Sequence, residues 1–338
     1  MESIKLLSVK SLEPRHLEKL CRVSPKLDVS QITCSDPKEI VQHLKGVEIL
    51  YTFNASFPLE AARDLKWVQL SSTGVNHLMD QPIMNSDILV TTTRGIHATP
   101  IAEFVFGSLL SLGRHLNEMR VDQLNHIWKG LSYWEKKGGL ELRGKTMCIV
   151  GYGAIGSEIG RLARAFGMRV IAVRKNPGYQ REKPGGMLPN TGDFSGSVPE
   201  RLIDPSALLE VLHECDVIVL SVPLTSETIS LIGQDEIMAM KPTAYLVNVA
   251  RGQVVDDVAL LGALQKGQLA GAVLDTFVEE PLPPDSPFWD LPNVLITPHV
   301  APNSSYYNDR ASDVFAENLR RYLSGEPLTN LFDRSLGY

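Results

Sequence analysis

The 338-residue chain has little cysteine and no long apolar or strongly charged run. Its cysteines lack C-x-x-C spacing, which favours free buried thiols in a reducing compartment over disulfides or a metal site. No apolar run approaches the ~20 residues of a membrane span. No basic region followed by an apolar stretch opens the sequence, so no secretory signal is expected. These absences predict a cytoplasmic protein with no membrane partner and no metal. The cysteines are Cys21, Cys34, Cys148 and Cys215.

Charge of one sign is also scarce. The formal net charge is −6, and it is spread without long blocks of like charge. A nucleic-acid-binding protein would show a basic domain or stripe, so no nucleic-acid partner is expected. The hydrophobic content of 43% and charged content of 21% are those of a globular protein with sizeable cores. The length suggests about two domains.

A glycine-rich turn between two apolar runs is the most informative feature that is present. Residues 147–157 read M-C-I-V-G-Y-G-A-I-G-S, and a helical pattern and a second apolar run follow. In this strand–turn–helix context the glycines allow a tight turn, close approach of backbone to a pyrophosphate, and close helix–strand packing. The helix N-terminus offers N–H groups to phosphates. A dinucleotide site is predicted, against the alternative of a merely tight turn, with contacts at Gly151, Gly153, Ala154, Ile155 and Gly156.

Strands alternate with helices along the whole chain, which predicts parallel sheets covered on both faces. A long helix is expected to open at Thr99, as N-cap, and Pro100, and to continue to about Leu124. The predicted fold is α/β, with two doubly wound parallel-sheet domains and a cleft between them. Residues 1–98 plus 304–338 form a flavodoxin-like substrate-binding domain. Residues 99–303 form a Rossmann dinucleotide-binding domain.

Two segments lack a clear period. Residues 126–144 are an expected irregular connection with Trp128 and Trp134, which favours either a subunit contact, in a homodimer, or packing over the same domain. A further hypothesis is that Trp134 reaches a neighbouring subunit's site. Residues 174–205 hold five prolines and five glycines. They are either a solvated insertion or a cover for the adenosine end of the cofactor.

Three side chains that can carry chemistry follow strand ends on the sheet edge that bears the glycine turn. They are Arg251, Glu280 and His299. Each alone is more often a surface or capping residue, but ligands in such sheets bind at this edge. Imidazole titrates near ~6.5 and suits a general acid/base, a nearby carboxylate orients it, and a guanidinium grips a carboxylate.

Over nearly its whole length the chain resembles the D-isomer-specific 2-hydroxyacid dehydrogenases. The motifs occur in the family's order: Gly74-Val75, Ala102-Glu103, the glycine turn 151–156, residues 220–225 around Pro223, residues 248–252 with Val255-Asp256, residues 274–282, and Thr297-Pro298-His299.

The resemblance implies roles for individual residues. His299 resembles the proton donor, Glu280 its paired carboxylate, and Arg251 the residue that grips the substrate carboxylate. Asp275 resembles the acceptor for the nicotinamide amide. The further cofactor contacts are Val222, Pro223, Thr228, Val249 and Ala250, together with Arg251 and His299. The substrate contacts are Phe53, Asn54, Gly74, Val75 and Asn76, together with Arg251 and His299.

Arg174 and Lys175 stand where NAD-preferring members of the family commonly carry an acid. Two cations would attract a ribose 2′-phosphate, so NADP(H) is expected to be preferred, with NAD(H) as the alternative cofactor. The expected reaction is reduction of a small 2-keto acid, such as glyoxylate or hydroxypyruvate, to the D-2-hydroxy acid. The alternatives are an NAD-dependent dehydrogenase for a bulkier acid and a cofactor-sensing regulator without enzymatic activity.

Overall fold

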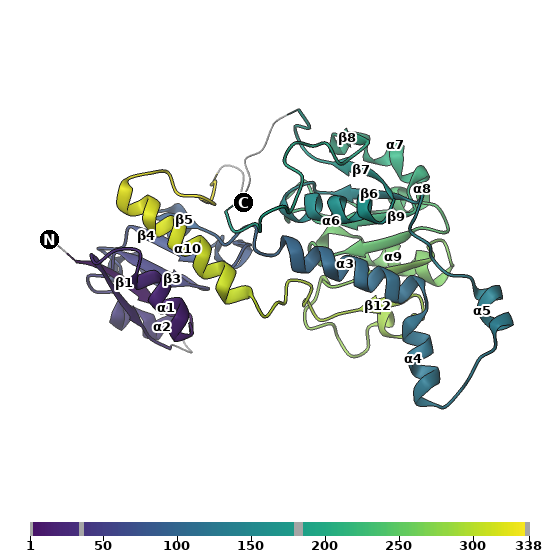
Figure 1. Ribbon diagram of the computed structural model, residues 1–338, viewed down its shortest axis with the longest axis horizontal. Coiled ribbons are helices and arrows are strands. Elements are labelled where there is room, and N and C mark those ends of the chain that lie inside the picture. Colours follow the sequence, from purple (N-terminus) through teal and green to yellow (C-terminus); the bar gives the residue numbers. More distant parts are fainter. Residues whose placement is uncertain (1–2, 34–36, 179–184, 335–338) are drawn as a thin grey trace. The chain divides into compact units, whose positions relative to one another are not determined.

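The computed structural model describes residues 3–33, 37–178 and 185–334. The chain divides into two compact units (Figure 1). Unit 1 comprises Met1–His97, Lys183–Leu188 and Ser304–Tyr338, and unit 2 comprises Ala98–Glu182 and Pro189–Asn303. No helix of the described residues is both long enough and apolar enough to cross a bilayer.

Unit 1 is built on a five-stranded sheet in which every pair of strands is parallel, in the order β2-β1-β3-β4-β5. The alternation of strands and helices in the sequence predicts this arrangement, and the structure confirms it. The strand β2 was not expected, and it is short, with Leu27 and Val29 as its apolar residues. The elements are β1 (Ile4–Ser8), α1 (Pro14–Cys21), β2 (Leu27–Gln31), α2 (Pro37–Ile40), β3 (Ile49–Thr52), β4 (Trp67–Leu70), β5 (Leu89–Thr91) and α10 (Tyr307–Ser324).

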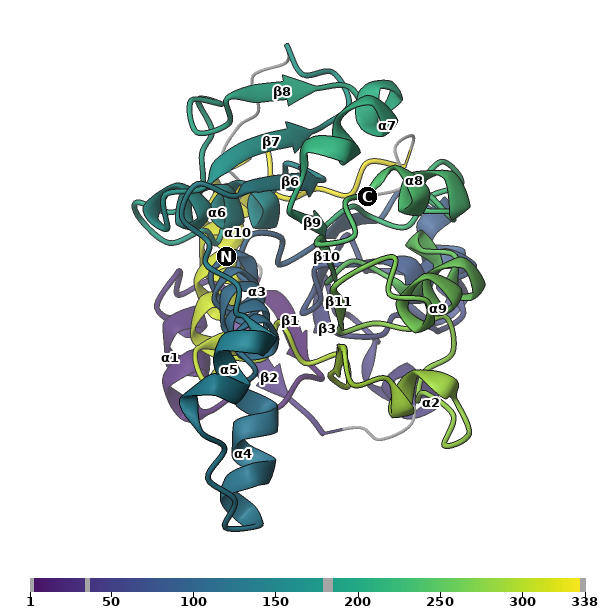
Figure 2. The same ribbon diagram turned by 90° about the vertical axis from the view of Figure 1, so that its right-hand side faces the viewer.

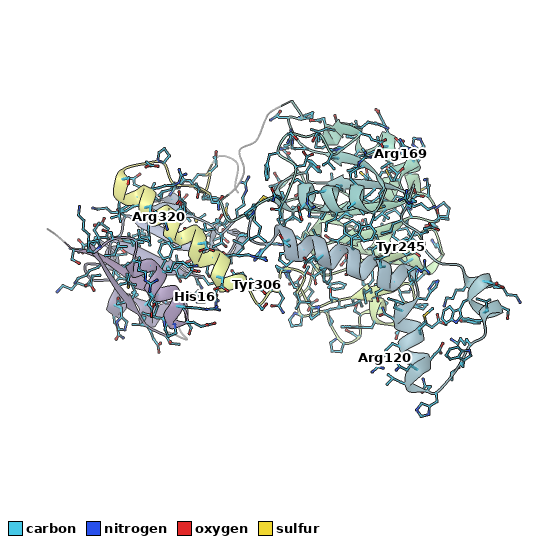
Figure 3. The ribbon with its side chains drawn as sticks, in the orientation of Figure 1. His16, Arg120, Arg169, Tyr245, Tyr306 and Arg320 are labelled. Atoms are coloured by element: carbon cyan, nitrogen blue, oxygen red, sulfur yellow. The ribbon has the colours of Figure 1, made fainter. Side chains whose placement is uncertain are left out.

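The last helix, α10, completes unit 1 by packing on α1 and on the sheet. Phe315 of α10 is fully buried, with its ring edge-on to Trp67 of β4 at 5.4 Å between centroids. His16 of α1, labelled in Figure 3, is also buried, and its Nε2 lies 2.9 Å from Asp309 Oδ1 of α10. A segment distant in the sequence therefore supplies part of this core.

A short stretch of the proline- and glycine-rich insertion belongs to unit 1, although the expected boundary left it in the second domain. Asn330 Nδ2 donates to Gly185 O at 3.3 Å. A Cβ added to Gly186 would approach within 2.5 Å of Val314 and 2.8 Å of Ile96, so the backbone lies directly on the unit 1 core.

Unit 2 is built on a seven-stranded parallel sheet in the order β12-β11-β10-β9-β6-β7-β8, most of which is visible from β8 to β11 in Figure 2. The elements are α3 (Ala98–Gly113), α4 (Leu116–Leu124), α5 (Leu131–Lys137), β6 (Thr146–Val150), α6 (Ala154–Ala165), β7 (Arg169–Val173), β8 (Arg201–Ile203), α7 (Leu208–Val211), β9 (Val217–Leu220), α8 (Gln234–Ala239), β10 (Tyr245–Asn248), α9 (Asp257–Gln265), β11 (Gly271–Leu274) and β12 (Val294–Ile296).

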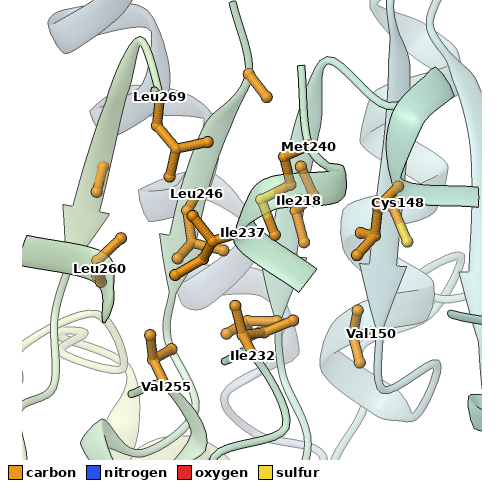
Figure 4. Packing of buried hydrophobic residues seen from close by; sticks show 14 of the residues in the cluster. Cys148, Val150, Ile218, Ile232, Ile237, Met240, Leu246, Val255, Leu260 and Leu269 are labelled. Carbon is orange, nitrogen blue, oxygen red and sulfur yellow. The ribbon is translucent and has the colours of Figure 1, made fainter. Parts of the chain in front are cut away.

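Both faces of this sheet carry a hydrophobic core, which is why its central strands are apolar throughout. Along β6, Cys148 and Val150 join the cluster under α7, α8 and α9, seen in Figure 4, and Met147 and Ile149 join the cluster under α3 and α6. A side chain of this size contributes about 1.5–3 kcal/mol when fully buried. The sheet is therefore a rigid platform for the loops at its carboxyl edge.

The helix expected from Thr99 to about Leu124 is wrong as a single element. The chain breaks after α3, at His115, whose φ is +58°, and α4 follows. Since α3 begins at Ala98, Thr99 lies inside the helix and is not its N-cap. The connection expected to be irregular contains α5, and α4 and α5 project from the rest of unit 2 in both ribbon views.

The insertion also holds a strand that its sequence did not predict. Within it, β8 pairs in parallel with β7 and extends the sheet by one edge strand. The three residues of β8 are too few to show the alternation of polar and apolar residues that predicts a strand. Residues 179–184 of the insertion and Cys34 lie outside the described residues. Of the other cysteines, Cys148 and Cys215 are buried, as expected, and Cys21 is exposed.

Candidate active site

The glycine turn joins β6 to α6 with the geometry that a pyrophosphate site requires. Gly151 has φ of +99°, and a Cβ there would lie 2.7 Å from the Ser221 carbonyl. A Cβ on Gly156 would collide with the Gly151 carbonyl oxygen. Gly153 is the N-cap of α6, and no side chain of the described residues caps that helix. The first N–H groups of α6, at Ala154, Ile155 and Gly156, can therefore donate to a phosphate at the positive end of the helix dipole. This arrangement fits a dinucleotide.

Part of the insertion is anchored beside this turn. Tyr152 OH donates to Asp193 Oδ2 at 2.9 Å, and Val198 N donates to the same oxygen at 3.0 Å. Gly192 N donates to Oε2 of the buried Glu158 of α6 at 2.7 Å. Residues 189–198 are thus packed against the start of α6.

Two cations follow β7, where a ribose 2′-substituent is expected. Arg174 Nη2 donates to Pro177 O at 2.8 Å, and Lys175 forms an ion pair with Glu227 from the loop after β9. Both members of the Lys175–Glu227 pair are more than half exposed. The loop after β7 and the loop after β9 are therefore joined by a solvated charge pair.

Hydrogen bonds shape the loops after β9 and β10. Thr228 Oγ1 donates to Pro223 O at 2.8 Å, and a Cβ added to Gly151 would lie 2.8 Å from Val222 N. The fully buried Asn248 accepts from Ala250 N at 3.0 Å and donates to Arg251 O at 3.0 Å. Val249 is buried beside them. These contacts set the path of the chain into Arg251.

His299 and Glu280 form a pair. His299 Nδ1 lies 2.9 Å from Glu280 Oε2, and Phe277 N donates to Glu280 Oε1 at 3.0 Å. A carboxylate only accepts, so Nδ1 carries the hydrogen and Nε2 is the ring nitrogen that does not contact Glu280.

Arg251 lies in the electrostatic field of the same carboxylate. Burial lowers the pKa of the Arg251 guanidinium from its usual value, and the charge of Glu280 opposes this shift. Arg251 Nη1 donates to Ala250 O at 2.7 Å. A Cβ on Gly252 would collide with the backbone of Phe277 and Val278, so the loop carrying Arg251 packs directly on the loop carrying Glu280. A cation, a carboxylate and an imidazole are therefore brought together on one sheet edge.

Asp275 directly follows β11 and is buried, and both oxygens of its carboxylate accept hydrogen bonds from the loop that carries His299. Thr297 Oγ1 and Val300 N donate to Oδ1, and Ala301 N donates to Oδ2. These three bonds join the Asp275 side chain to the loop 297–301. The expected contact between Asp275 and a nicotinamide amide stays a prediction.

Apart from Arg251 and His299, which lie in unit 2, the predicted substrate residues lie in unit 1, after the neighbouring strands β3 and β4. Phe53 and Asn54 follow β3, and Gly74 and Val75 precede the turn that opens at Asn76. Asn54 Oδ1 accepts from Ser56 N at 3.0 Å, and Ser72 Oγ donates to Gly74 O at 2.9 Å.

Three contacts of the predicted site residues were not expected from the sequence. They join Phe53 to His77, Lys175 to Glu227 and Asp275 to Thr297. The His77 ring stacks on Phe53 at 4.6 Å, and His77 Nε2 lies 2.8 Å from Phe53 O. The two residues of each contact are far apart in the sequence, so their spacing could not predict the contact. For Thr297 the sequence did contain a signal, because its hydroxyl follows β12 and lies two residues before His299.

Comparisons with known proteins agree on one family. The sequence model described as "D-isomer specific 2-hydroxyacid dehydrogenase, NAD binding domain" matches residues 106–301. A glyoxylate reductase of Korarchaeum cryptofilum is 35% identical over 277 residues, which are 82% of this chain and 79% of that protein.

Solved structures of the same family share the fold. A D-isomer-specific 2-hydroxyacid dehydrogenase family protein from Aeromonas salmonicida is 31% identical with a TM-score of 0.79, covering 98% of this chain and 99% of that one. An NADPH-dependent glyoxylate/hydroxypyruvate reductase from Sinorhizobium meliloti, solved with NADP and sulfate, is 26% identical with a TM-score of 0.76, covering 99% of this chain and 100% of that one.

Proposed function

Because the chain belongs to the D-isomer-specific 2-hydroxyacid dehydrogenase family, we propose that it reduces a small 2-keto acid with NADPH to give the D-2-hydroxy acid. It is an NAD(P)-dependent oxidoreductase, and glyoxylate and hydroxypyruvate are the first substrates to test. The observation that carries the proposal is the His299–Glu280 pair beside Arg251. The relatives named glyoxylate reductase support the choice of substrate.

The three residues have complementary tasks. His299 Nε2 gives its proton to the carbonyl oxygen of the substrate, while Glu280 holds the ring by Nδ1 and balances the charge of the protonated imidazole. Arg251 binds the substrate carboxylate and polarises the ketone. The reduced dinucleotide supplies the hydride when it is bound. In the reverse direction His299 takes the proton back.

The remaining contacts are proposed from their places at the sheet edges. Residues 151 and 153–156 hold the pyrophosphate, and Val222, Pro223, Thr228, Val249 and Ala250 line the dinucleotide. In unit 1 the backbone N–H groups of residues 74–76 bind the substrate carboxylate, and Phe53 and Asn54 contact its side chain. We accordingly assign substrate binding to residues 1–98 and 304–338, to which the structure adds residues 185–188, and dinucleotide binding to the rest of residues 99–303.

Arg174 and Lys175 support NADPH over NADH, because a 2′-phosphate would gain two cationic partners. The pairing of Lys175 with Glu227 favours the alternative, an NAD-dependent enzyme for a bulkier acid, because Glu227 already neutralises one of those cations. The kcat/KM for each cofactor decides between them. A kcat/KM for NADH equal to or above that for NADPH contradicts the proposal, and the double change Arg174→Asp with Lys175→Ala is expected to move preference toward NADH.

The projecting segment of α4 and α5 supports a homodimer. Glu118 accepts from Lys129 Nζ, Lys137 Nζ and Tyr133 OH, and these three bonds, first the one from Lys129, lower the pKa of Glu118 to about 2. They connect α4 with α5 across the segment. Its outer apolar side chains, Leu124, Trp128 and Leu131, are 64%, 95% and 74% exposed. A second copy of the chain would cover them.

A panel of 2-keto acids tests the proposed activity directly. The expected result is NADPH oxidation with glyoxylate or hydroxypyruvate and a product of D configuration. A flat trace with the whole panel, while NADPH still binds, would instead support a cofactor-sensing regulator.

A further inference from the structure

Tyr152 links the glycine turn to the proline- and glycine-rich insertion. It lies between Gly151 and Gly153, it is 2% exposed, and its hydroxyl donates to Asp193 Oδ2 of the insertion at 2.9 Å. Its ring packs closely on α6, because a Cβ added to Gly160 would lie 2.9 Å from the Tyr152 hydroxyl oxygen. The side chain at the centre of the turn is therefore held between a helix and the insertion.

Asp193 is itself buried and fixed by a compact loop of the insertion. Its Oδ2 also accepts from Val198 N at 3.0 Å, and its Oδ1 accepts from Ser197 N at 3.1 Å and from Ser195 Oγ at 2.9 Å. Burial opposes the charge of the carboxylate, but the hydrogen bonds, first the one from Val198 N, outweigh it and lower the pKa of Asp193. Asp193 is thus an anion at neutral pH and a strong acceptor for the Tyr152 hydroxyl.

A second buried carboxylate ties the same loop to α6. Gly192 N donates to Oε2 of Glu158 at 2.7 Å, and Arg161 donates to both oxygens of Glu158. Because Gly192 immediately precedes Asp193, the position of Asp193 is set by α6 and not by the glycine turn.

The glycine turn has few restraints of its own. Gly151 and Gly153 have more conformational freedom than other residues. The N–H groups of Gly151 and Tyr152 donate to Val173 O at 3.0 and 3.1 Å, which holds the turn on the side of β7. The bond from Tyr152 to Asp193 adds a restraint from the insertion. Hydrogen bonds to a phosphate weaken steeply when the donors move out of line, so the position of the turn decides how well it binds a pyrophosphate.

We propose that Asp193 is a positioning residue that holds the glycine turn in place for the pyrophosphate of the dinucleotide by fixing Tyr152. This inference rests on the proposed pyrophosphate contacts of residues 151 and 153–156. It differs from both interpretations of the insertion drawn from the sequence, a solvated segment and a cover for the adenosine, because residues 192–198 act through the turn. Loss of Asp193 therefore weakens dinucleotide binding and leaves kcat at saturating NADPH in place.

Asp193→Asn and Tyr152→Phe test this inference. In either orientation the NH₂ group of an asparagine would face a backbone N–H, that of Ser197 or that of Val198, whereas Tyr152→Phe removes only the hydroxyl. We expect each variant to raise the Kd for NADPH and for ADP by about 3- to 10-fold, the size of one hydrogen bond. The kcat at saturating NADPH should change by less than about twofold.

Asp216→Asn is the matched control. Asp216 is also a buried carboxylate of unit 2, but it accepts from Thr146 N at 2.9 Å, at the end of β6 opposite to the glycine turn, and from Lys241 Nζ at 3.1 Å. Its replacement should lower the melting temperature, as the other variants do, and leave both Kd values unchanged. The control thus separates lost affinity from lost stability.

The double variant tests whether Asp193 acts through Tyr152. We expect it to bind ADP about as weakly as Asp193→Asn alone, because both changes break the same link. Losses of affinity that multiply would overturn the inference, as would ADP binding within about twofold of the unaltered protein in both single variants, or an equal loss in Asp216→Asn.

Binding of ADP does not require turnover. If the unaltered protein reduces no 2-keto acid, the proposed function fails, while the ADP titration still decides the role of Asp193. If Asp193→Asn does not fold, Tyr152→Phe compared with Asp216→Asn carries the same test.

Discussion

His299 Nδ1 and Glu280 Oε2 lie 2.9 Å apart, although the two residues come from different loops of the unit 2 sheet. In the proposed mechanism, Nε2 is therefore the proton donor, and the Glu280 carboxylate stabilises the positive charge of the protonated ring. Glu280 is itself held by Phe277 N. Both oxygens of the Glu280 carboxylate thus accept a hydrogen bond.

Glu280→Gln keeps the shape of the side chain and removes its charge. We expect kcat with the best 2-keto acid to fall by about 10- to 100-fold, because the protonated imidazole loses its partner. Steady-state kinetics measure the change, and Glu279→Gln, at the neighbouring position, is the matched control. Equal kcat values for the two variants would exclude a catalytic role for Glu280.

Glu227→Gln tests the cation pair after β7. It releases Lys175 from its ion pair, so kcat/KM for NADPH should rise by about 2- to 5-fold while that for NADH stays the same. The gain is small because both side chains are exposed and an exposed pair is worth about 1 kcal/mol or less. The affinities for 2′,5′-ADP and ADP measure the same preference without turnover. An equal change for both ligands would remove Lys175 from the 2′-phosphate site.

The double change Trp128→Ser with Leu131→Asp tests the proposed dimer surface. We expect a dimer of the unaltered protein and a monomer of the variant, because a charge replaces apolar area that the second copy would bury. Sedimentation velocity measures the state. Val258→Ser, at an exposed valine of α9, is the control and should remain dimeric. A monomeric unaltered protein would contradict the proposal.

Trp134 has a different environment from Trp128. Its ring packs edge-on to Tyr133 at 5.0 Å and lies 6.2 Å from the His115 ring. The hypothesis that it reaches a neighbouring subunit's site requires Trp134→Ala to raise the KM for the 2-keto acid or to alter the oligomeric state. If neither changes, Trp134 serves the packing of its own segment.

Asp257 makes stability depend on pH. Burial, together with the neighbouring charge of Asp256, raises the pKa of Asp257 from 3.8 to about 6. Between these values the folded state keeps a proton that the unfolded state has lost, so stability from this residue falls as the pH rises through the window. Asp257→Asn should be more stable than the unaltered protein by about 1 kcal/mol at about pH 7, allowing for partial exposure, and equally stable near pH 4. Urea unfolding at both pH values measures the difference. A difference that does not depend on pH would contradict the assignment.

Local patterns in the sequence were enough for the two parallel sheets and the glycine turn, because apolar strands and a G-x-G-x-x-G turn are encoded within about 30 residues. The break at His115 was not predictable, since no proline interrupts the helical pattern there. The three-residue β8 was equally hidden. Asp275 was recognised as a site residue, but its contacts come from residues 22 to 26 positions later in the chain. Only the folded loop brings them together.

His299→Asn tests whether His299 donates the proton to the 2-keto acid. The measurement is kcat for NADPH-dependent reduction of glyoxylate or hydroxypyruvate, together with the Kd for NADPH in the same preparations. We expect kcat to fall by about 10²- to 10⁴-fold, the size of a general acid's contribution, with an unchanged Kd. Turnover in His299→Asn within about twofold of the unaltered protein would contradict it.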